Sequence, residues 1–319
     1  MAVRIAGEAL NACSGCEISL LDMGERFITL METLRIVHLP LLMDSKHSGI
    51  TGRDQSFDIP EADIGLVSGS IKTHDHFHLA RAMREACSTV VALGTCAGHG
   101  GIPAMANAYD NQEIKQCFLS TISTDEGSLF PATQVPALMD TCRAVDEIIR
   151  VDHYLPGCPP HPDHIFGLLT ALAKGQHYDL PTKSVCSNCP ALRNGKGEVL
   201  RLSRPLDVPA KAPSGTGESR DGLLCFIEQG FLCMGPVTID GCGGNTSLAR
   251  CIEAGVPCRG CFGPLPYPGD QRLAMLNALV SNGIDLDSLP ETRSLLRFSG
   301  SHGHLTPPFG KKDIKTDVS

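Results

Sequence analysis

The chain has 319 residues, 15 cysteines, no tryptophan and a formal net charge of −8. This length allows two domains with substantial cores, and the acidic balance gives no basic surface for nucleic acid. No stretch approaches the roughly eighteen uninterrupted apolar residues of a membrane-spanning helix. The first residues, MAVRIAGEALNAC, have the pattern of a strand and not of an export signal, so we expect a cytoplasmic protein without membrane insertion.

The cysteine count points to metal rather than to disulfides. An odd number of cysteines without an export signal argues against a disulfide framework, because thiols stay reduced in the cytosol. The alternative, a set of scattered buried thiols, does not account for the recurring spacing described below.

Strands and helices alternate along the first half of the chain. Apolar runs rich in β-branched residues predict strands at 3–6, 35–42, 63–70, 89–94 and 150–155. Helical spacing of apolar residues predicts helices near 17–34, 73–88, 135–149 and 161–174, while 101–134 is less regular. This order predicts an α/β fold, a flavodoxin-like, doubly wound parallel sheet with right-handed crossovers, in a domain over residues 1–178.

The character of the sequence changes after residue 178. Residues 203–221 are rich in proline, glycine and serine and predict a loop. Residues 225–264 hold six cysteines among many glycines and prolines, a composition too irregular for a large apolar core. We therefore predict a small irregular domain over 179–270 that metal organises, and a C-terminal extension over 271–319 that ends in a flexible tail at 300–319.

Four cysteines of the first domain follow predicted strands. Cys13 and Cys16 follow the first strand, Cys96 lies in LGTCAGHGG, and Cys158 lies in LPGCPPHP. Because the carboxyl ends of parallel strands line one crevice, these four thiols can converge, and the glycines beside them let backbone N–H groups approach a bulky cluster. Four thiolates fit an iron–sulfur cluster or a structural zinc, and a proline after Cys158 and after Cys189 favours iron–sulfur.

Eight further cysteines lie in the second domain and make two more sets of four. A zinc ribbon is the alternative for the C-x-x-C pairs, but it leaves the remaining cysteines unexplained. The eight are Cys186, Cys189, Cys225, Cys233, Cys242, Cys251, Cys258 and Cys261. Cys87 and Cys142 lie in helical patterns and Cys117 in an apolar stretch, and we predict that these three are ordinary buried or half-buried thiols.

The motifs CSGCE, GTCAGHGG and GCPP resemble the three signatures of the small, electron-transfer subunit of nickel–iron hydrogenases. The resemblance covers nearly the whole chain and implies three 4Fe-4S clusters. The proximal cluster would take Cys13, Cys16, Cys96 and Cys158. The distal cluster would take Cys186, Cys189, Cys225 and Cys233. The medial cluster would take Cys242, Cys251, Cys258 and Cys261.

Two cysteines separate this chain from the membrane-associated members of that family. Cys186 stands where those members have a histidine, and Cys251 stands where they have a proline that leaves a 3Fe-4S medial cluster. They also carry a twin-arginine export signal. The differences resemble the cytoplasmic branch, especially the methyl-viologen-reducing (deazaflavin-independent) hydrogenases that feed heterodisulfide reductase. A related subunit of respiratory complex I fits less well, because it has adjacent cysteines in the first motif and lacks the eight-cysteine domain.

The resemblance places the nickel site in a partner chain. VPCRGC at 256–261 has Val256 where the large subunit's motif has an aspartate, and no second R-x-C-x-x-C motif exists. The implied function is to conduct electrons from hydrogen oxidation in a nickel–iron large subunit to an iron–sulfur acceptor subunit and heterodisulfide reductase. The alternatives are a deazaflavin-, NAD(P)- or sulfur-reducing hydrogenase, a hydrogen sensor, or a complex I-like subunit.

Three other motifs have an ordinary structural interpretation. GTCAGHGG follows a strand but matches neither a dinucleotide nor a Walker phosphate loop. His74 and His78 in THDHFH could bind zinc, although Thr73 as a helix N-cap followed by solvated histidines is the commoner arrangement. Glu17 could relay protons or contact a partner subunit, and it would also simply stabilise the first turn of a helix.

Overall fold

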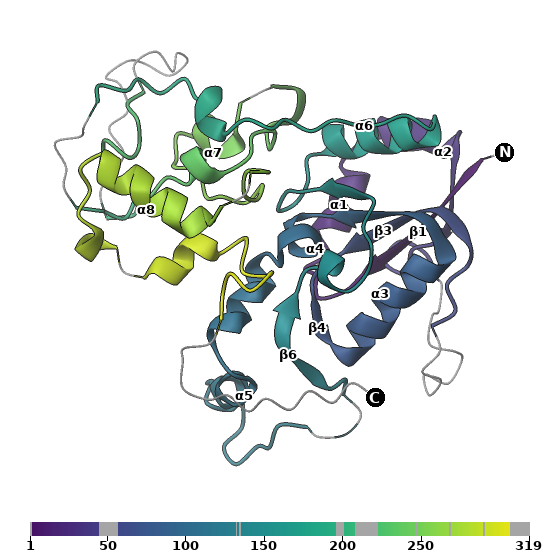
Figure 1. The fold of residues 1–319 in the computed structure, drawn as a ribbon. Helices are drawn as coiled ribbons and strands as arrows, with labels where there is room; N and C mark the ends of the chain where they lie inside the picture. The colour runs from purple at the N-terminus through teal and green to yellow at the C-terminus, as the bar shows by residue number, and fades with distance from the viewer. Residues whose placement is uncertain are drawn as a thin grey trace.

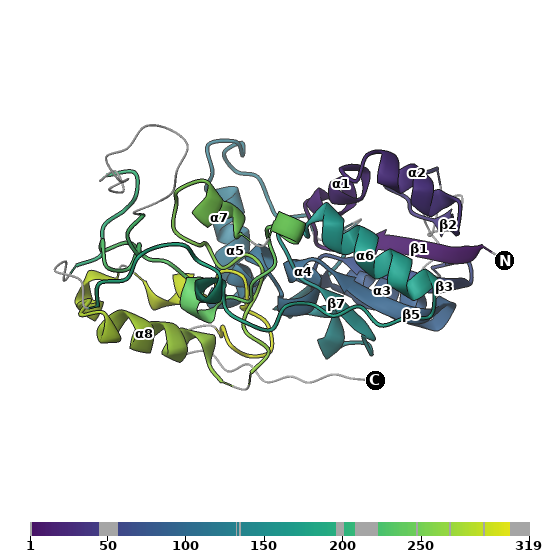
Figure 2. The ribbon, with the colours of Figure 1, turned by 90° about the horizontal axis from the view of Figure 1, so that it is seen from above.

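The computed structural model describes residues 2–44, 57–131, 133, 135–195, 201–207, 223–246, 248–267, 269–289 and 291–306. These residues form two lobes side by side (Figure 1, Figure 2). The first lobe holds the main sheet, and the second holds α7 (Arg250–Glu253) and α8 (Gln271–Ser281). Within the described ranges, no helix is long and apolar enough to cross a membrane.

The first lobe is built on a five-stranded parallel sheet with the strand order β2-β1-β3-β5-β7. The strands are β1 (Val3–Ala9), β2 (Leu34–His38), β3 (Ala62–Ser68), β5 (Cys87–Leu93) and β7 (His153–Leu155). Counted along the sheet's own strands, the order is 2-1-3-4-5, which is the flavodoxin-like order with its switch point between β1 and β3. The predicted α/β fold is therefore confirmed.

Helices cover both faces of the sheet, and the strands are apolar on both sides as a result. Val91 and Leu93 face α1 (Gly15–Leu21), α2 (Glu25–Met31) and α6 (Pro162–Ala173). Val90 and Ala92 face α3 (His74–Ala86) on the other side. These side chains are almost fully buried, and burial of each large aliphatic side chain contributes roughly 1.5–3 kcal/mol.

The predicted helices at 73–88 and 161–174 are confirmed as α3 and α6, but the one at 17–34 is interrupted. α1 and α2 are separated by a turn that ends at Gly24, whose φ of 59° lies in the left-handed region. Leu20 and Leu30, one from each helix, are both buried against the sheet. Apolar residues continue at helical spacing through this turn, so the sequence pattern does not reveal that the helix is interrupted.

The helix predicted over 135–149 is wrong, because residues in this segment form β6 (Leu138–Arg143). β6 pairs antiparallel with β4 (Ile71–Thr73). The Lys72 ammonium donates to the carbonyl of Met139 over 2.9 Å and to that of Asp140 over 3.3 Å. Pairing with β4 and the bonds from Lys72 therefore satisfy backbone groups that a helix would pair internally. Residues 101–134 contain η1 (Ile102–Ala108) and α5 (Asn111–Leu119).

The second lobe has a larger apolar core than its composition predicts. Phe226 and Phe231 pack with Met275 and Leu279 of α8, and all four side chains are at most 2% exposed. Short 3-10 turns complete this lobe: η3 (Val185–Ser187), η4 (Gly235–Val237), η5 (Gly244–Thr246), η6 (Leu286–Ser288) and η7 (Thr292–Leu296). Of the loop predicted at 203–221, residues 203–207 form a bridge and a turn, and the rest lies outside the described residues. The proposed domain boundaries after 178 and 270 stay predictions.

The segment 300–306 folds back onto the first lobe, so the predicted flexible tail is wrong there; residues 307–319 lie outside the described part of the chain. Leu305 is 4% exposed and packs with Ala108 of η1. The Asn107 amide donates to the carbonyl of Gly300 over 3.2 Å and to that of Cys142 over 2.8 Å. One buried amide thus joins η1, β6 and the C-terminal segment.

His302 adds an ion pair to this C-terminal segment, with its Nε2 2.8 Å from Asp146 Oδ1. The hydrogen bond to Asp146 raises the pKa of His302. Burial acts to raise the pKa of Asp146, but the bonds from His302 and Tyr154 outweigh it, so this pKa is lowered. The pair is fully formed below the unfolded pKa of histidine and above the pKa of Asp146, and it is lost as pH rises through the raised pKa of His302.

His302→Asn is expected to lower the free energy of unfolding by roughly 0.5–1 kcal/mol near pH 6, with little effect at pH 9. Asparagine is chosen because His302 has a φ of 56°, which asparagine tolerates. Urea unfolding at the two pH values measures the difference. An equal loss at both would show that the ion pair is not the cause.

Candidate metal centres

The proximal set, Cys13, Cys16, Cys96 and Cys158, lies at the carboxyl edge of the parallel sheet. Cys13 follows β1, and Cys16 begins the first turn of α1. Cys96 lies in α4 (Thr95–His99), directly after β5, and Cys158 follows β7. Three strand ends thus bring together four residues that lie far apart in the sequence, from Cys13 to Cys158.

The thiols of the proximal set are close enough to change one another's pKa. The pKa of Cys16 is raised first by burial, then by Glu17, and then by the three other thiols of the set. Burial, followed by the charges of Cys158 and Cys13, raises the pKa of Cys96 to about 12, against an opposing hydrogen bond from the N–H of Ile102. A group that binds Cys16 and Cys96 as thiolates must therefore bring positive charge.

Two glycines leave the space that the proximal sulfurs occupy. A Cβ on Gly94 would collide with Cys16 Sγ, and a Cβ on Gly101 would lie 2.5 Å from Cys96 Sγ. Both glycines have a positive φ, 87° and 54°, which other residues rarely adopt. The backbone can therefore approach the sulfurs closely, and the N–H of Ile102, which follows Gly101, donates to Cys96 Sγ.

The distal set, Cys186, Cys189, Cys225 and Cys233, lies in the second lobe around η3 and η4. Burial raises the pKa of Cys233 to about 11, with further increases from Cys225 and Cys189. The N–H groups of Gly235 and Cys258 oppose this shift, the latter with its nitrogen 3.3 Å from Cys233 Sγ. The thiol of Cys233 therefore already accepts the kind of N–H···S bonds that stabilise a bound thiolate.

The medial set consists of Cys242, Cys251, Cys258 and Cys261, and two of its thiols interact electrostatically with thiols of the other two sets. Burial raises the pKa of Cys261 to about 12, followed by the charges of Cys242 and Cys251 and then of Cys158 in the proximal set. Burial also raises the pKa of Cys258, and Cys233 of the distal set is the next cause. Within the described residues no group of three or more His, Cys, Asp or Glu converges as one metal ion would require.

His164 is a supporting residue that sequence reasoning missed. Its side chain is buried in α6, with Nε2 2.7 Å from the carbonyl of Gly241 and Nδ1 2.7 Å from the hydroxyl of Tyr178. Nε2–H donates to the Gly241 carbonyl, because a carbonyl oxygen can only accept, while either partner can donate in the bond between Nδ1 and the Tyr178 hydroxyl. His164 holds the residue before Cys242 in place. In the sequence, His164 has no feature that distinguishes it from other polar residues of a helix.

Two of the three cysteines outside the sets behave as predicted. Cys87 and Cys142 are 3% and 1% exposed, although they lie in strands β5 and β6 and not in helices. Cys117 contradicts the prediction, because its side chain is exposed on α5. No side chain of α5 is fully buried, so the apolar stretch around Cys117 does not mark a core position.

The structure confirms an ordinary capping role for the histidine motif, whereas Glu17 is buried with one carboxylate oxygen unpaired among the described residues. Thr73 caps α3 by accepting the N–H of His76 over 3.2 Å, and His74 and His78 are exposed, which confirms the capping interpretation. Glu17 is 3% exposed and accepts a hydrogen bond from the Ser68 hydroxyl. Its second carboxylate oxygen is buried and finds no hydrogen-bond partner among the described residues.

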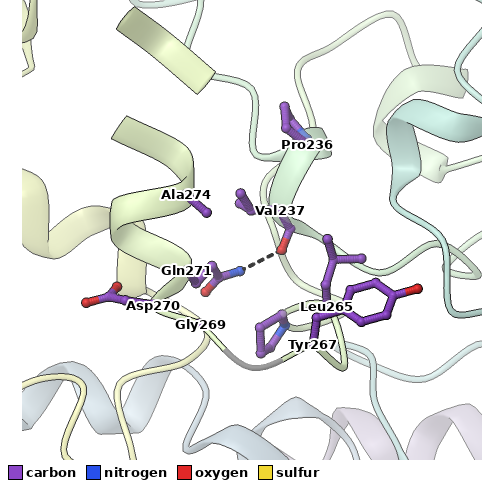
Figure 3. A pocket seen from close by; sticks show the side chains of 9 residues that line it. Pro236, Val237, Leu265, Tyr267, Gly269, Asp270, Gln271 and Ala274 are labelled. Carbon is purple, nitrogen blue, oxygen red and sulfur yellow. Dashed lines mark hydrogen bonds between the residues drawn. The ribbon is translucent and has the colours of Figure 1, made fainter. Parts of the chain in front are cut away.

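A cavity of about 150 Å³ lies in the second lobe between η4 and the start of α8 (Figure 3). The Gln271 amide donates to the carbonyl of Val237 over 3.1 Å, and Asp270 caps α8 by accepting the N–H of Arg272 over 2.7 Å. Neither cysteine nor histidine lines this cavity, so the metal chemistry lies elsewhere.

Comparison with known proteins fits this arrangement. Residues 13–172, which include the whole proximal set, match the family described as NADH ubiquinone oxidoreductase, 20 Kd subunit. A subunit of the vhu F420-non-reducing hydrogenase of Methanocaldococcus jannaschii is 35% identical over 93% of this chain and 94% of its own length. The chain belongs to this family of F420-non-reducing hydrogenase subunits.

Other members and structures of hydrogenases agree with this membership. The relative from Archaeoglobus profundus, named as the iron-sulfur subunit of an F420-non-reducing hydrogenase, is 32% identical over 88% of both chains. A solved structure of an NAD+-reducing NiFe-hydrogenase in its H2-reduced state is 33% identical with a TM-score of 0.51, and the match covers 57% of this chain and 96% of that one. The family thus consists of hydrogenase subunits, which makes this chain part of an oxidoreductase.

Gly94→Ala is expected to lower the metal bound per chain by about a third, the share of one set of four thiols among three. The new methyl group would collide with Cys16 Sγ, and the backbone conformation would be strained. Metal analysis after anaerobic purification measures the loss.

Gly175→Ala is the matched control, because Gly175 also has a positive φ, 66°, but open space around its Cα. This variant is expected to keep its full metal content. If Gly94→Ala kept it too, the steric argument would be wrong.

Proposed function

We propose that this chain is the electron-transfer subunit of a nickel–iron hydrogenase. Its twelve set cysteines hold three 4Fe-4S clusters, proximal, medial and distal, and the nickel site belongs to a separate large subunit. When bound, such clusters accept and release single electrons at potentials that the protein sets. Electrons from hydrogen oxidation would enter at the proximal set and leave at the distal set.

The single observation that carries the proposal is the electrostatic grouping of the thiols. For most of these thiols, the first sulfur that shifts the pKa belongs to the same set, as in Cys16, Cys186 and Cys261. Cys258 is the exception, because Cys233 of the distal set acts on it before the thiols of its own set. The medial set thus interacts with the proximal set through Cys261 and with the distal set through Cys258. A linear order with the medial set in the middle is the arrangement that a conductor between two partner subunits needs.

The chain's own residues would place and tune each cluster. Cysteine thiolates supply the ligands, and backbone N–H groups such as those of Ile102 and Gly260 donate to the sulfurs, which stabilises the reduced, more negative state. Burial around Cys233 and Cys258 keeps water away from the sulfurs. No residue of this chain is assigned a part in splitting hydrogen.

Exposed side chains beside the proximal and distal sets support the assignment of the two partners. Cys13 and Cys158 are exposed, and beside the proximal set Ile18 and Ile102 are 55% and 45% exposed. We assign this surface to the nickel-carrying large subunit. Cys186 of the distal set is also exposed, which suits an iron–sulfur acceptor subunit that passes electrons towards heterodisulfide reductase in the cytoplasm.

Metal analysis of the anaerobically purified chain with its co-purifying subunits tests the proposal. Three four-iron clusters predict about twelve irons and twelve labile sulfides per chain, with nickel only when a larger partner is present. About four irons would limit the clusters to one and favour a complex I-like subunit. Zinc without sulfide would mean a structural zinc protein and would refute the proposal.

Cys251→Pro is expected to convert the medial cluster towards 3Fe-4S, with the loss of about one iron per chain and a higher potential. Cys251 lies at the second position of α7, within the first turn, where proline's missing N–H is tolerated. EPR spectroscopy during a redox titration measures the change. An unchanged spectrum would remove Cys251 from the ligands.

A further inference from the structure

Thr95 lies at the junction of the two lobes and is 1% exposed. It opens α4, the helix that carries Cys96. Its backbone N–H donates to the carbonyl of Gly157 over 2.9 Å, and the N–H of Gly157 donates back to Thr95 Oγ1 over 2.8 Å. This reciprocal pair fixes Thr95 to the residue before Cys158, so Thr95 is attached to two ligands of the proximal set.

The hydroxyl of Thr95 also reaches the medial set. Oγ1 donates to the backbone carbonyl of Cys261 over 2.7 Å. A hydroxyl has one proton to donate, and here Gly157 already donates to its oxygen, so both roles are committed. The thiols of Cys158 and Cys261 lie near this bond as well, because the charge of Cys158 contributes to the raised pKa of Cys261.

We propose that Thr95 is the positioning residue that sets the separation of the proximal and medial cysteine sets, and with it the coupling between the clusters they hold. The inference rests on the proposed function and adds a determinant of electron transfer to it. Without the hydroxyl, the carbonyl of Cys261 would lose its bond from Thr95, and the N–H of Gly157 would be left unpaired in a buried site. The N–H of Gly157 could regain a partner only if water entered this junction, which would move the two sets apart.

Other bonds hold the lobes together independently of Thr95. His164 bonds to the carbonyl of Gly241, and the N–H of Asn245 donates to Asp163 over 3.0 Å. Both contacts join α6 to the chain around Cys242 and involve neither Cys96 nor Cys158. Loss of the Thr95 hydroxyl is therefore expected to change the spacing at one junction and to leave the chain folded.

The test is Thr95→Val, which keeps the shape of the side chain and removes both hydrogen bonds. The fully reduced complex, purified anaerobically, is studied by EPR spectroscopy, and iron per chain is measured on the same sample. Magnetic interaction between two reduced clusters falls with the cube of their separation. We expect the valine variant to keep its iron and to show a smaller proximal–medial magnetic splitting.

Two further variants separate the hydroxyl from general packing. Thr95→Ser keeps the hydroxyl and is expected to retain the splitting of the unmodified complex. Thr170→Val makes the same chemical change in α6 at a buried hydroxyl that has no hydrogen-bond partner among the described residues, and it is expected to have no effect.

Each outcome decides the proposal. An unchanged splitting in Thr95→Val, or an equal loss in Thr95→Ser, would overturn it, the second because packing of the methyl group would then be responsible. If Thr95→Val lost iron, the hydroxyl would be needed to retain a cluster rather than to set the separation of the sets, and the proposal would be overturned. An unmodified complex with only four irons would refute the proposed function itself, whatever the variants did.

Discussion

Repulsion between neighbouring, partly buried sulfurs is the constraint on which the rest of the structure depends. Burial first, and then the adjacent thiols, raise the pKa of Cys96 and of Cys261 to about 12, so each of these two thiols becomes a thiolate only when a positively charged group binds it. Backbone N–H groups that donate to the sulfurs oppose this rise in pKa, and glycines leave the space that the backbone needs to approach the sulfurs. Geometry and electrostatics together favour a positively charged partner for the thiols, which under the proposed function is an iron–sulfur cluster.

The two lobes meet that constraint in different ways. In the first lobe, a parallel sheet brings distant residues to one edge, and its apolar faces supply the stability. In the second lobe, turns carry the cysteines, and a core around Met275 and Leu279 of α8 holds the turns together. The second solution depends on a helix that follows the last cysteine in the chain.

The sequence predicted the sheet and the first set because both rest on local signals, namely apolar strands and the residues directly after them. It failed where a distant partner decides. Pairing with β4 and the bonds from Lys72 satisfy backbone groups of β6, and α8 completes a core that the cysteine-rich segment cannot build alone. Thr95 and His164 were missed because their importance lies in backbone atoms of the other lobe, to which they bond. A hydrogen bond to a distant carbonyl leaves no pattern in the sequence.

The hydrogen bond of the Asn107 amide has a consequence for the order in which parts of the structure can form. It joins η1, which bonds to Cys96, to the carbonyl of Gly300, near the end of the described chain. A ribosome synthesises residue 300 after all 15 cysteines, so the bond between Asn107 and Gly300 can form only when every thiol of the chain has already been made.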